Sequence, residues 1–230
     1  MDYHTFSVDG PKGANQDRLV EPFLLNGVWT AAVADGVGGN PGGEIAAQIA
    51  VEVVRKSKGT ERPADLFQLA CADMLKHADK DARLSRMATT LTLLRIRERK
   101  ATIAHVGDTR AYHVRGKGLI TRTEDHTEVA HLLRENIISP RQARDYPRRN
   151  ILTSYLSASG SFETFESEFD LIEGDKILLL TDGVYSAVNK RELVELADQM
   201  VTAIQYGQRI EGALRSRRIR DDSSAVVIVV

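Results

Sequence analysis

The chain has 230 residues, of which 42% are hydrophobic, enough to bury a sizeable core in one large domain or two small ones. The formal net charge of −1 gives no reason to expect non-specific binding to nucleic acid. The single cysteine, Cys71, excludes an internal disulfide framework and fits a reducing compartment. It lies in a helical pattern without a nearby histidine or lysine motif, so we interpret it as a small core residue.

The first ten residues lack the charged-then-apolar pattern typical of a signal peptide. The longest apolar runs are about five to seven residues, well short of the roughly 20 needed to span a bilayer. We therefore expect a soluble, cytoplasmic protein with no membrane partner, and we expect it to be a monomer. No repeat, low-complexity tract or Pro/Ser-rich linker divides residues 1–230, so a single domain is expected.

The first part of the chain alternates short apolar segments with glycine-rich turns. Its expected strands are His4–Val8, Arg18–Val20 and Trp29–Ala34. Helices are expected at Glu44–Lys56 and at Ala64–Asp81, where apolar residues recur with helical spacing.

Residues 88–122 are rich in threonine and valine and have short connections, which predicts an antiparallel meander. Its expected strands are Ala88–Arg95, Ala101–Gly107, Arg110–Arg115 and Leu119–Arg122. Short helices are expected at Glu124–Arg134 and Pro140–Asp145.

The last part returns to strands and then to helices. The expected strands are Phe165–Phe169 and Lys176–Leu180, followed by helices at Arg191–Met200 and Ile204–Ser216 and by a closing strand at Ala225–Val230. The closing strand is apolar at every position, which predicts burial on both faces. Two batches of antiparallel strands with helices outside predict an α+β fold, in which two sheets pack face to face under helices. The alternative is a single sheet with helices on one side.

Four aspartates lie beside a glycine or a second acid, at the ends or edges of expected strands. They are Asp35, Asp108, Asp182 and Asp221. An acid buried at a strand end needs a cation or another partner, because apolar strands leave no water to hydrate it. Four such acids that converge would form an oxygen-rich cage suited to Mg²⁺ or Mn²⁺. This pattern predicts a metal-dependent hydrolase.

Each acid also has a plainer interpretation. Asp35 can belong to an ordinary turn, although the glycine after it would let the Gly36 carbonyl face a cation as well. Asp182 is open to the same two interpretations. Asp17 can hold a metal-bound water or close an Asx turn, and Asp108 can stabilise a hairpin turn.

The adjacent acids Asp221 and Asp222 repel each other, which calls for a nearby cation. The alternative partners are Arg217, Arg218 and Arg220. His126, beside Asp125, can touch substrate or be an exposed residue next to a helix cap. His105 is interpreted as structural.

Seven short motifs occur in one order along the chain. They are NQDR at 15–18, VADGVGG at 33–39, ATTLTLL at 88–94, HVGDTRAY at 105–112, DHT at 125–127, LLLTDGV at 178–184 and DDSSAVVIV at 221–229. The ordered set covers nearly the whole chain and resembles the protein phosphatase 2C family, the metal-dependent Ser/Thr phosphatases, in a compact bacterial form. The resemblance implies a four-layer α-β-β-α sandwich of two antiparallel sheets flanked by helices, with a flap at about 125–150.

The resemblance also implies two Mn²⁺ or Mg²⁺ ions per chain. Asp35 would bridge the two ions, and the Gly36 carbonyl would ligate one of them. Asp182 and Asp221 would complete the second site. A bridging hydroxide would attack the phosphoryl group directly, without a covalent intermediate.

Two more acids acquire implied roles. Asp108 would hold a third, weaker ion together with Asp182, as in bacterial members of the family. Asp17 would orient metal-bound water. The implied catalytic group is therefore Asp17, Asp35, Asp182 and Asp221.

Three positions depart from the family pattern. Lys12 stands where the family usually has an arginine that binds phosphate, so it keeps the charge and loses the bidentate fork. Asn40 replaces a histidine found in many members and cannot donate a proton as a general acid. Asp221-Asp222 replaces the common Asp-Asn, as in some stress-signalling members.

The resemblance implies an active phosphatase that removes phosphate from serine or threonine and opposes a cytoplasmic Ser/Thr kinase. Asp221-Asp222 suggests an alternative, a phosphatase restricted to one phosphoprotein of a partner-switching pathway. Lys12 and Asn40 suggest another, a non-catalytic regulator that binds phosphoproteins. In the flap, Arg148 and Arg149 can select substrate or be solvated.

Overall fold

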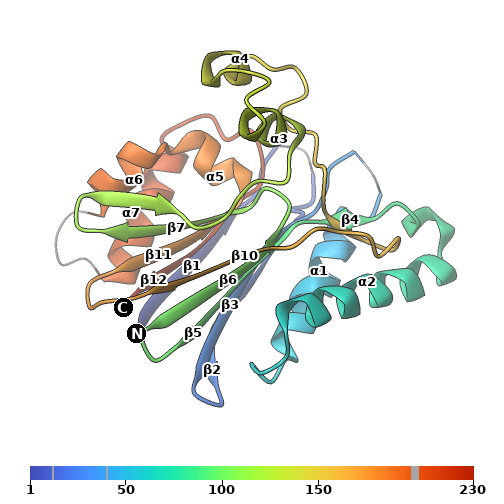
Figure 1. The fold of residues 1–230 in the computed structure, drawn as a ribbon, viewed down its shortest axis with the longest axis horizontal. Helices are drawn as coiled ribbons and strands as arrows, with labels where there is room; N and C mark the ends of the chain where they lie inside the picture. Colours follow the sequence, from blue (N-terminus) through green and yellow to red (C-terminus); the bar gives the residue numbers. More distant parts are fainter. Residues whose placement is uncertain (12, 40, 198–201) are drawn as a thin grey trace.

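The computed structural model describes residues 1–11, 13–39, 41–197 and 202–230. Two five-stranded antiparallel sheets pack face to face, with helices on both outer sides (Figure 1). This confirms the predicted α+β sandwich with its α-β-β-α layers, and the single-sheet alternative is wrong. No helix within the described ranges is both long and apolar enough to cross a membrane.

The first sheet has the strand order β1-β12-β11-β7-β8. Its strands are β1 (Asp2–Val8), β12 (Ser223–Val229), β11 (Lys176–Leu180), β7 (Arg110–Arg115) and β8 (Gly118–Thr121). The helices on its outer side are α5 (Asp182–Ala187), α6 (Lys190–Leu196) and α7 (Ala203–Arg215). The expected helix Arg191–Met200 ends outside the described residues, since residues 198–201 are not among them. As predicted, β12 is buried on both faces.

The second sheet has the strand order β10-β6-β5-β3-β2. Its strands are β10 (Phe165–Asp170), β6 (Lys100–Val106), β5 (Leu91–Arg97), β3 (Val28–Asp35) and β2 (Asp17–Leu25). Its outer side is covered by α1 (Gly43–Arg55) and α2 (Pro63–Lys80) (Figure 1). After the short helix η1 (Ala82–Leu84), the chain forms β4 (Ala88–Thr89), which pairs with β9 (Leu156–Ser157).

The core has three apolar layers, because side chains alternate between the two faces of each strand. The middle layer joins the two sheets and includes Val33, Ile103, Leu179, Val226 and Ile228. One outer layer packs the second sheet against α1 and α2, and the other packs the first sheet against α7. Cys71 is 2% exposed within α2, which confirms that it is a core residue. Burial of each valine, leucine or isoleucine contributes about 1.5–3 kcal/mol.

The predicted meander over residues 88–122 is wrong in one respect that matters for the site. β5 pairs with β6 and β7 pairs with β8, but β6 and β7 belong to different sheets. The chain crosses between the sheets through Gly107, whose φ of 107° lies in a region that side chains disfavour. Asp108 therefore lies at a crossing between the sheets and not in a hairpin turn.

Other differences concern element bounds. β2 extends to Leu25 with a bulge between Val20 and Phe23, and its proline is tolerated because β2 is an edge strand. α3 (Glu128–Arg134) begins four residues later than expected, where the Thr127 hydroxyl caps it by accepting from the Ala130 amide. The short helix α5 was not expected.

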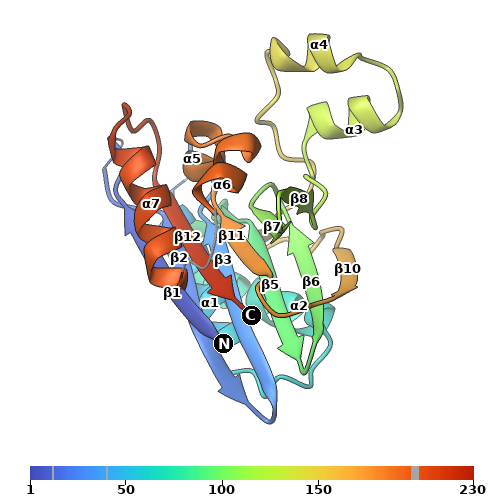
Figure 2. The same ribbon diagram turned by 90° about the vertical axis from the view of Figure 1, so that its left-hand side faces the viewer.

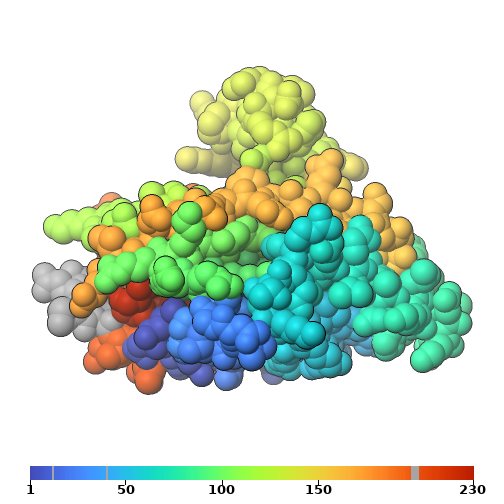
Figure 3. Space-filling model, turned by 60° about the horizontal axis from the view of Figure 1, so that its bottom comes forward, coloured from blue at the N-terminus to red at the C-terminus, as the bar shows by residue number. Residues whose placement is uncertain are grey.

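Residues 125–150 contain α3 and α4 (Pro140–Arg144), and neither of these fully described helices has a buried residue. They project beyond the ends of both sheets (Figure 2). In the space-filling view the same segment stands out from the body of the molecule (Figure 3). We call residues 125–150 the flap, and its functional role remains a prediction.

Candidate metal centre

Acids from both sheets meet at one end of the sandwich. Asp17 and Asp35 face each other in register at the ends of β2 and β3. Asp108 lies at the crossing from β6 to β7, Asp182 begins α5 directly after Thr181, and Asp221 precedes β12. A cavity of about 810 Å³ is lined by Asp35, Gly36, Asp108, Asp182 and Asp221 together with other residues. The structure therefore brings together all four acids singled out from the sequence.

The electrostatics of the cavity favour a cation. Burial raises the pKa of Asp35 well above its usual value, and the negative charges of its neighbours raise it further. These neighbours are Asp17, Asp182, Asp108 and Asp221. Burial, reinforced by the charge of Asp182, raises the pKa of Asp108 to about 7. Such a set of mutually repelling oxygen donors is what a hard divalent cation stabilises.

No three Asp, Glu, His or Cys side chains of the described residues are arranged so that they could hold a metal ion by themselves. Mg²⁺ keeps several water ligands and takes only one or two carboxylates from the protein. The partly buried acids around the cavity therefore fit hydrated Mg²⁺ or Mn²⁺ ions. The individual ligand roles of Asp35, Gly36, Asp108, Asp182 and Asp221 remain predictions.

The Asp35-Gly36 turn is held rigidly by its surroundings. The Asp35 carbonyl accepts from the Thr89 hydroxyl at 2.8 Å and from the Thr90 amide at 2.9 Å. A Cβ atom on Gly36 would lie 2.4 Å from the carbonyl carbon of Gly43, at the start of α1. Only glycine fits this close approach of two backbones, so the turn is far more specific than an ordinary Asp-Gly turn.

Asp17 is anchored from the opposite sheet. The Thr181 hydroxyl donates to Asp17 Oδ2 at 2.8 Å and accepts from the Ser224 amide at 2.9 Å. The other oxygen, Asp17 Oδ1, is buried without a hydrogen-bond partner among the described residues. Asp17 also closes an Asx-type turn, because its amide donates to the Asn15 side chain at 2.9 Å. The Asx-type turn is therefore confirmed, and a role of Asp17 in holding a metal-bound water remains a prediction.

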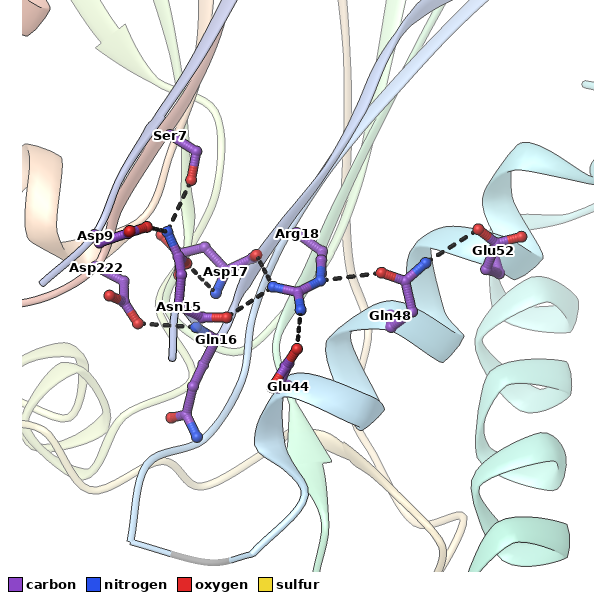
Figure 4. Close-up of polar contacts among 10 residues, drawn as sticks. All are labelled: Ser7, Asp9, Asn15, Gln16, Asp17, Arg18, Glu44, Gln48, Glu52 and Asp222. Atoms are coloured by element: carbon purple, nitrogen blue, oxygen red, sulfur yellow. Dashed lines mark hydrogen bonds and ion pairs between the residues drawn. The ribbon is translucent and has the colours of Figure 1, made fainter. Parts of the chain in front are cut away.

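Asp222 has a structural task. One oxygen accepts from the Gly10 amide at 2.7 Å. The other accepts from the Gln16 amide at 2.9 Å (Figure 4). Asp222 thus ties the loop between β1 and β2 to the start of β12. Arg217, one of the alternative partners, pairs instead with Glu192 at 2.7 Å.

Arg18 is a supporting residue that the sequence did not single out. Its guanidinium donates to the Asn15 carbonyl at 2.8 Å, to Gln48 at 3.0 Å and to Glu44 at 2.5 Å (Figure 4). It therefore connects the loop before Asp17 to α1. Only the position of Arg18 in the NQDR motif could have pointed to it.

The base of the flap is bound to the segment around Asp108. The Gly107 amide donates to His126 Nδ1 at 3.1 Å, and the His126 amide donates to the Gly107 carbonyl at 2.7 Å. The His126 ring stacks on His105, with ring centroids 5.3 Å apart. His126 is therefore not an exposed imidazole, as one interpretation had it. His105 is fully buried and lies 2.8 Å from the Thr92 hydroxyl, which confirms a structural role.

Two predicted residues lie outside the described part of the chain, namely Lys12 and Asn40. The flap arginines are engaged within the flap itself. Arg148 pairs with Glu128 at 2.8 Å, and Arg149 donates to the Arg144 carbonyl at 2.8 Å. At the end of the flap Asn150 lines the cavity, followed by Ile151 and Leu152.

Comparison with known proteins places these features in one family. Residues 12–215 match the family described as Protein phosphatase 2C. The serine/threonine phosphatase stp of Listeria monocytogenes serovar 1/2a is 32% identical over 198 residues, which cover 76% of this chain and 78% of that protein. The protein phosphatase PhpP of Streptococcus pneumoniae is 26% identical over 221 residues, or 88% of this chain and 89% of that protein.

Solved structures agree with the fold. A bacterial serine phosphatase superposes with a TM-score of 0.90 over 100% of this chain and 98% of that chain, at 22% identity. The catalytic domain of the phosphatase PstP, solved in complex with two manganese ions, gives a TM-score of 0.82 at 22% identity, over 98% and 96% of the two chains. The family match and the relative from Listeria together show that this chain belongs to the protein phosphatase 2C family.

Proposed function

We propose that this protein hydrolyses phosphoserine and phosphothreonine in phosphoproteins. Membership of the protein phosphatase 2C family makes it a metal-dependent phosphoprotein phosphatase. The observation that carries the assignment is the convergence of acids from both sheets on one cavity. In this proposal Asp35, the Gly36 carbonyl, Asp182 and Asp221 hold two Mn²⁺ or Mg²⁺ ions, and Asp108 with Asp182 holds a third.

When bound, the ions supply Lewis-acid activation of water and neutralise charge on the phosphoryl oxygens. The protein contributes orientation. The Asp35-Gly36 turn is kept in place by Thr89, Thr90 and the start of α1, so its donors need little reorganisation. Asp17 is fixed through Oδ2 by Thr181. Its Oδ1, which has no hydrogen-bond partner among the described residues, is the atom we assign to orient the attacking water and accept its hydrogen bond.

A covalent route through the thiol has no support. Cys71 is buried in α2, and burial raises the pKa of its thiol, which lowers the fraction of reactive thiolate. Cys71 is absent from the described residues that line the cavity. Direct attack by water on the phosphoryl group is therefore the step that these residues support.

The test is hydrolysis of p-nitrophenyl phosphate and of a phosphothreonine peptide with Mn²⁺, Mg²⁺ or EDTA. Asp35→Asn is compared with wild type and with Asp79→Asn, a matched change at an exposed position in α2. We expect metal-dependent release that EDTA and Asp35→Asn abolish and that Asp79→Asn retains. Unchanged turnover in Asp35→Asn would contradict the metal assignment.

The same assay distinguishes two alternative functions. A phosphatase restricted to one phosphoprotein would cleave that substrate rapidly and generic phosphopeptides poorly. A non-catalytic regulator, although folded, would release no phosphate from these substrates with any metal.

We further propose that the protein acts as a cytoplasmic monomer and opposes a Ser/Thr kinase that phosphorylates the same substrates.

A further inference from the structure

The candidate active-site cavity is lined almost entirely by acidic and neutral residues. Its acidic lining residues are Asp35, Glu44, Asp108, Asp182, Asp221 and Asp222. Among the described lining residues, Arg86 is the one arginine or lysine. A phosphorylated substrate is an anion, so beyond any metal ions Arg86 is the described lining side chain whose positive charge attracts it.

The backbone next to Arg86 is held firmly beside the Asp35-Gly36 turn. Met87 is fully buried, and the Ala88 carbonyl accepts from the Val37 amide at 2.9 Å. A Cβ on Gly42 would lie 3.0 Å from the Cβ of Met87, so the loop before α1 packs closely against the same segment. The backbone of Arg86 is therefore held in place near the candidate metal ligands.

The side chain of Arg86 is exposed, and no hydrogen bond or ion pair engages it within the part of the chain that is described. Arg83, three residues earlier, is equally exposed but pairs with Asp81, with Nη2 2.7 Å from Oδ2. The two arginines differ in that Arg83 is occupied by a carboxylate and lies outside the cavity lining. Arg86 keeps its donors available for a ligand.

We propose that Arg86 is a substrate-binding residue whose guanidinium binds the phosphoryl oxygens of the substrate. The inference rests on the proposed phosphatase activity. A guanidinium presents parallel N–H donors that match two oxygens of a phosphate, which a lysine ammonium cannot reproduce. Lys12, the residue expected to bind phosphate, has no such fork, and Arg86 supplies one from another segment of the chain.

The experiment uses the Mn²⁺-loaded protein and measures KM and kcat for p-nitrophenyl phosphate and the inhibition constant for inorganic phosphate. Arg86→Gln and Arg86→Lys are compared with Arg83→Gln, which removes the same charge three residues away. We expect Arg86→Gln to raise KM and the phosphate inhibition constant about 3- to 10-fold, the range between exposed and desolvated charged contacts. Arg86→Lys is expected to fall between Arg86→Gln and wild type, and Arg83→Gln to match wild type, with kcat little changed throughout.

Three results would overturn the inference. They are unchanged constants in Arg86→Gln, an equal change in Arg83→Gln, and an effect seen with a phosphopeptide but not with p-nitrophenyl phosphate or phosphate. A wild type that releases no phosphate would instead refute the proposed activity. In that case calorimetric titration of inorganic phosphate into the Mn²⁺-loaded wild type and Arg86→Gln still decides the role of Arg86, with weaker binding in the variant expected and equal binding contradicting it.

Discussion

Arg110 forms a bidentate ion pair with Asp125, with Nε 3.0 Å from Oδ1 and Nη2 2.6 Å from Oδ2. The guanidinium also lies over the ring of Tyr185, 3.8 Å from its centroid. Arg110 follows Asp108 by two residues, and Asp125 is the first residue of the flap. The flap is therefore attached to the segment that carries a candidate metal ligand. A substitution at the base of the flap is expected to affect the cavity as well.

Asp125→Asn is expected to weaken this attachment, because it leaves the mostly buried Arg110 without its charged partner. We expect a loss of about 2 kcal/mol in the free energy of unfolding, together with faster hydrogen exchange over residues 126–150. Glu124→Gln is the matched control, since the Glu124–Arg134 pair next to it is largely exposed. Equal protection of the flap in wild type and Asp125→Asn would contradict the prediction.

Because acids cluster at the candidate metal site, Asp35→Asn is expected to stabilise the metal-free protein and to reduce the stabilisation that added metal provides. In EDTA the variant is expected to melt at a higher temperature than wild type, because one of the repelling carboxylates is gone. Added Mn²⁺ is expected to stabilise wild type, by about 2.7 kcal/mol at a hundredfold excess over Kd, and to stabilise the variant much less. Thermal melts in EDTA and in Mn²⁺ measure both effects. A variant that gains as much from Mn²⁺ as wild type would refute a metal role for Asp35.

Gly36→Ala is expected to impair both the fold and the candidate metal site. Its Cβ would lie 2.4 Å from Gly43 C and 2.5 Å from Gly43 O, and both atoms belong to backbone that cannot simply rotate away. Gly212→Ala in α7 is the control, because no atom outside the neighbouring backbone of α7 lies within 4 Å of the position of its Cβ. We expect Gly212→Ala to be stabilising by about 0.5–1 kcal/mol and Gly36→Ala to lower both the melting temperature and Mn²⁺ affinity. Normal Mn²⁺ binding by Gly36→Ala would show that this turn is not part of the site.

Asp175 lies at the end of the first sheet opposite the candidate metal centre, and through it the stability of the protein is expected to depend on pH. Burial alone would raise the pKa of Asp175, but hydrogen bonds from Arg115 and the Ile172 amide, together with His113 Nε2 at 3.0 Å, outweigh it and hold the pKa below its usual value. A carboxyl whose pKa is depressed by folding stabilises the protein above its unfolded pKa of about 3.9, and this stabilisation is lost as pH falls further.

Asp175→Asn is therefore expected to cost about 3 kcal/mol at pH 7, and the difference from wild type is expected to shrink below about pH 4. Urea unfolding of both proteins across this range measures it. Glu173→Gln, at an exposed position in the same turn, serves as the control and should leave the pH profile unchanged. A difference that stays constant down to pH 2 would contradict the ionic role of Asp175.

The layers of the fold and the acids of the site could be predicted, because both depend on local patterns. Apolar strands end where Asp35 and Asp182 begin, and strand ends meet at the edges of a sheet. The sheet to which a strand belongs has no such local signal. The segments before and after Asp108 have the composition of a hairpin, yet they belong to different sheets. The sheet that each strand joins is decided by the packing of the whole chain.

The hydrogen-bond partners of polar side chains also could not be predicted from the sequence. Asp222 looked like a candidate for a cation or an arginine, but it binds the amides of Gly10 and Gln16, more than 200 residues away in sequence. Arg18 reaches α1 in a similar way. Such contacts depend on how the loop between β1 and β2 lies against β12, which becomes defined only when the tertiary structure forms.

The position of β12 within the first sheet determines when, during translation, the protein can first become active. β12 lies between β1 and β11 in the first sheet, with Asp2 opposite Val229, and it follows every other strand in the sequence. A nascent chain that has not yet released β12 from the ribosome lacks the neighbour of β1, and lacks Asp221 in place. Metal affinity and phosphatase activity should therefore appear only when translation of this region is complete, and chains interrupted before β12 should be inert toward phosphoproteins.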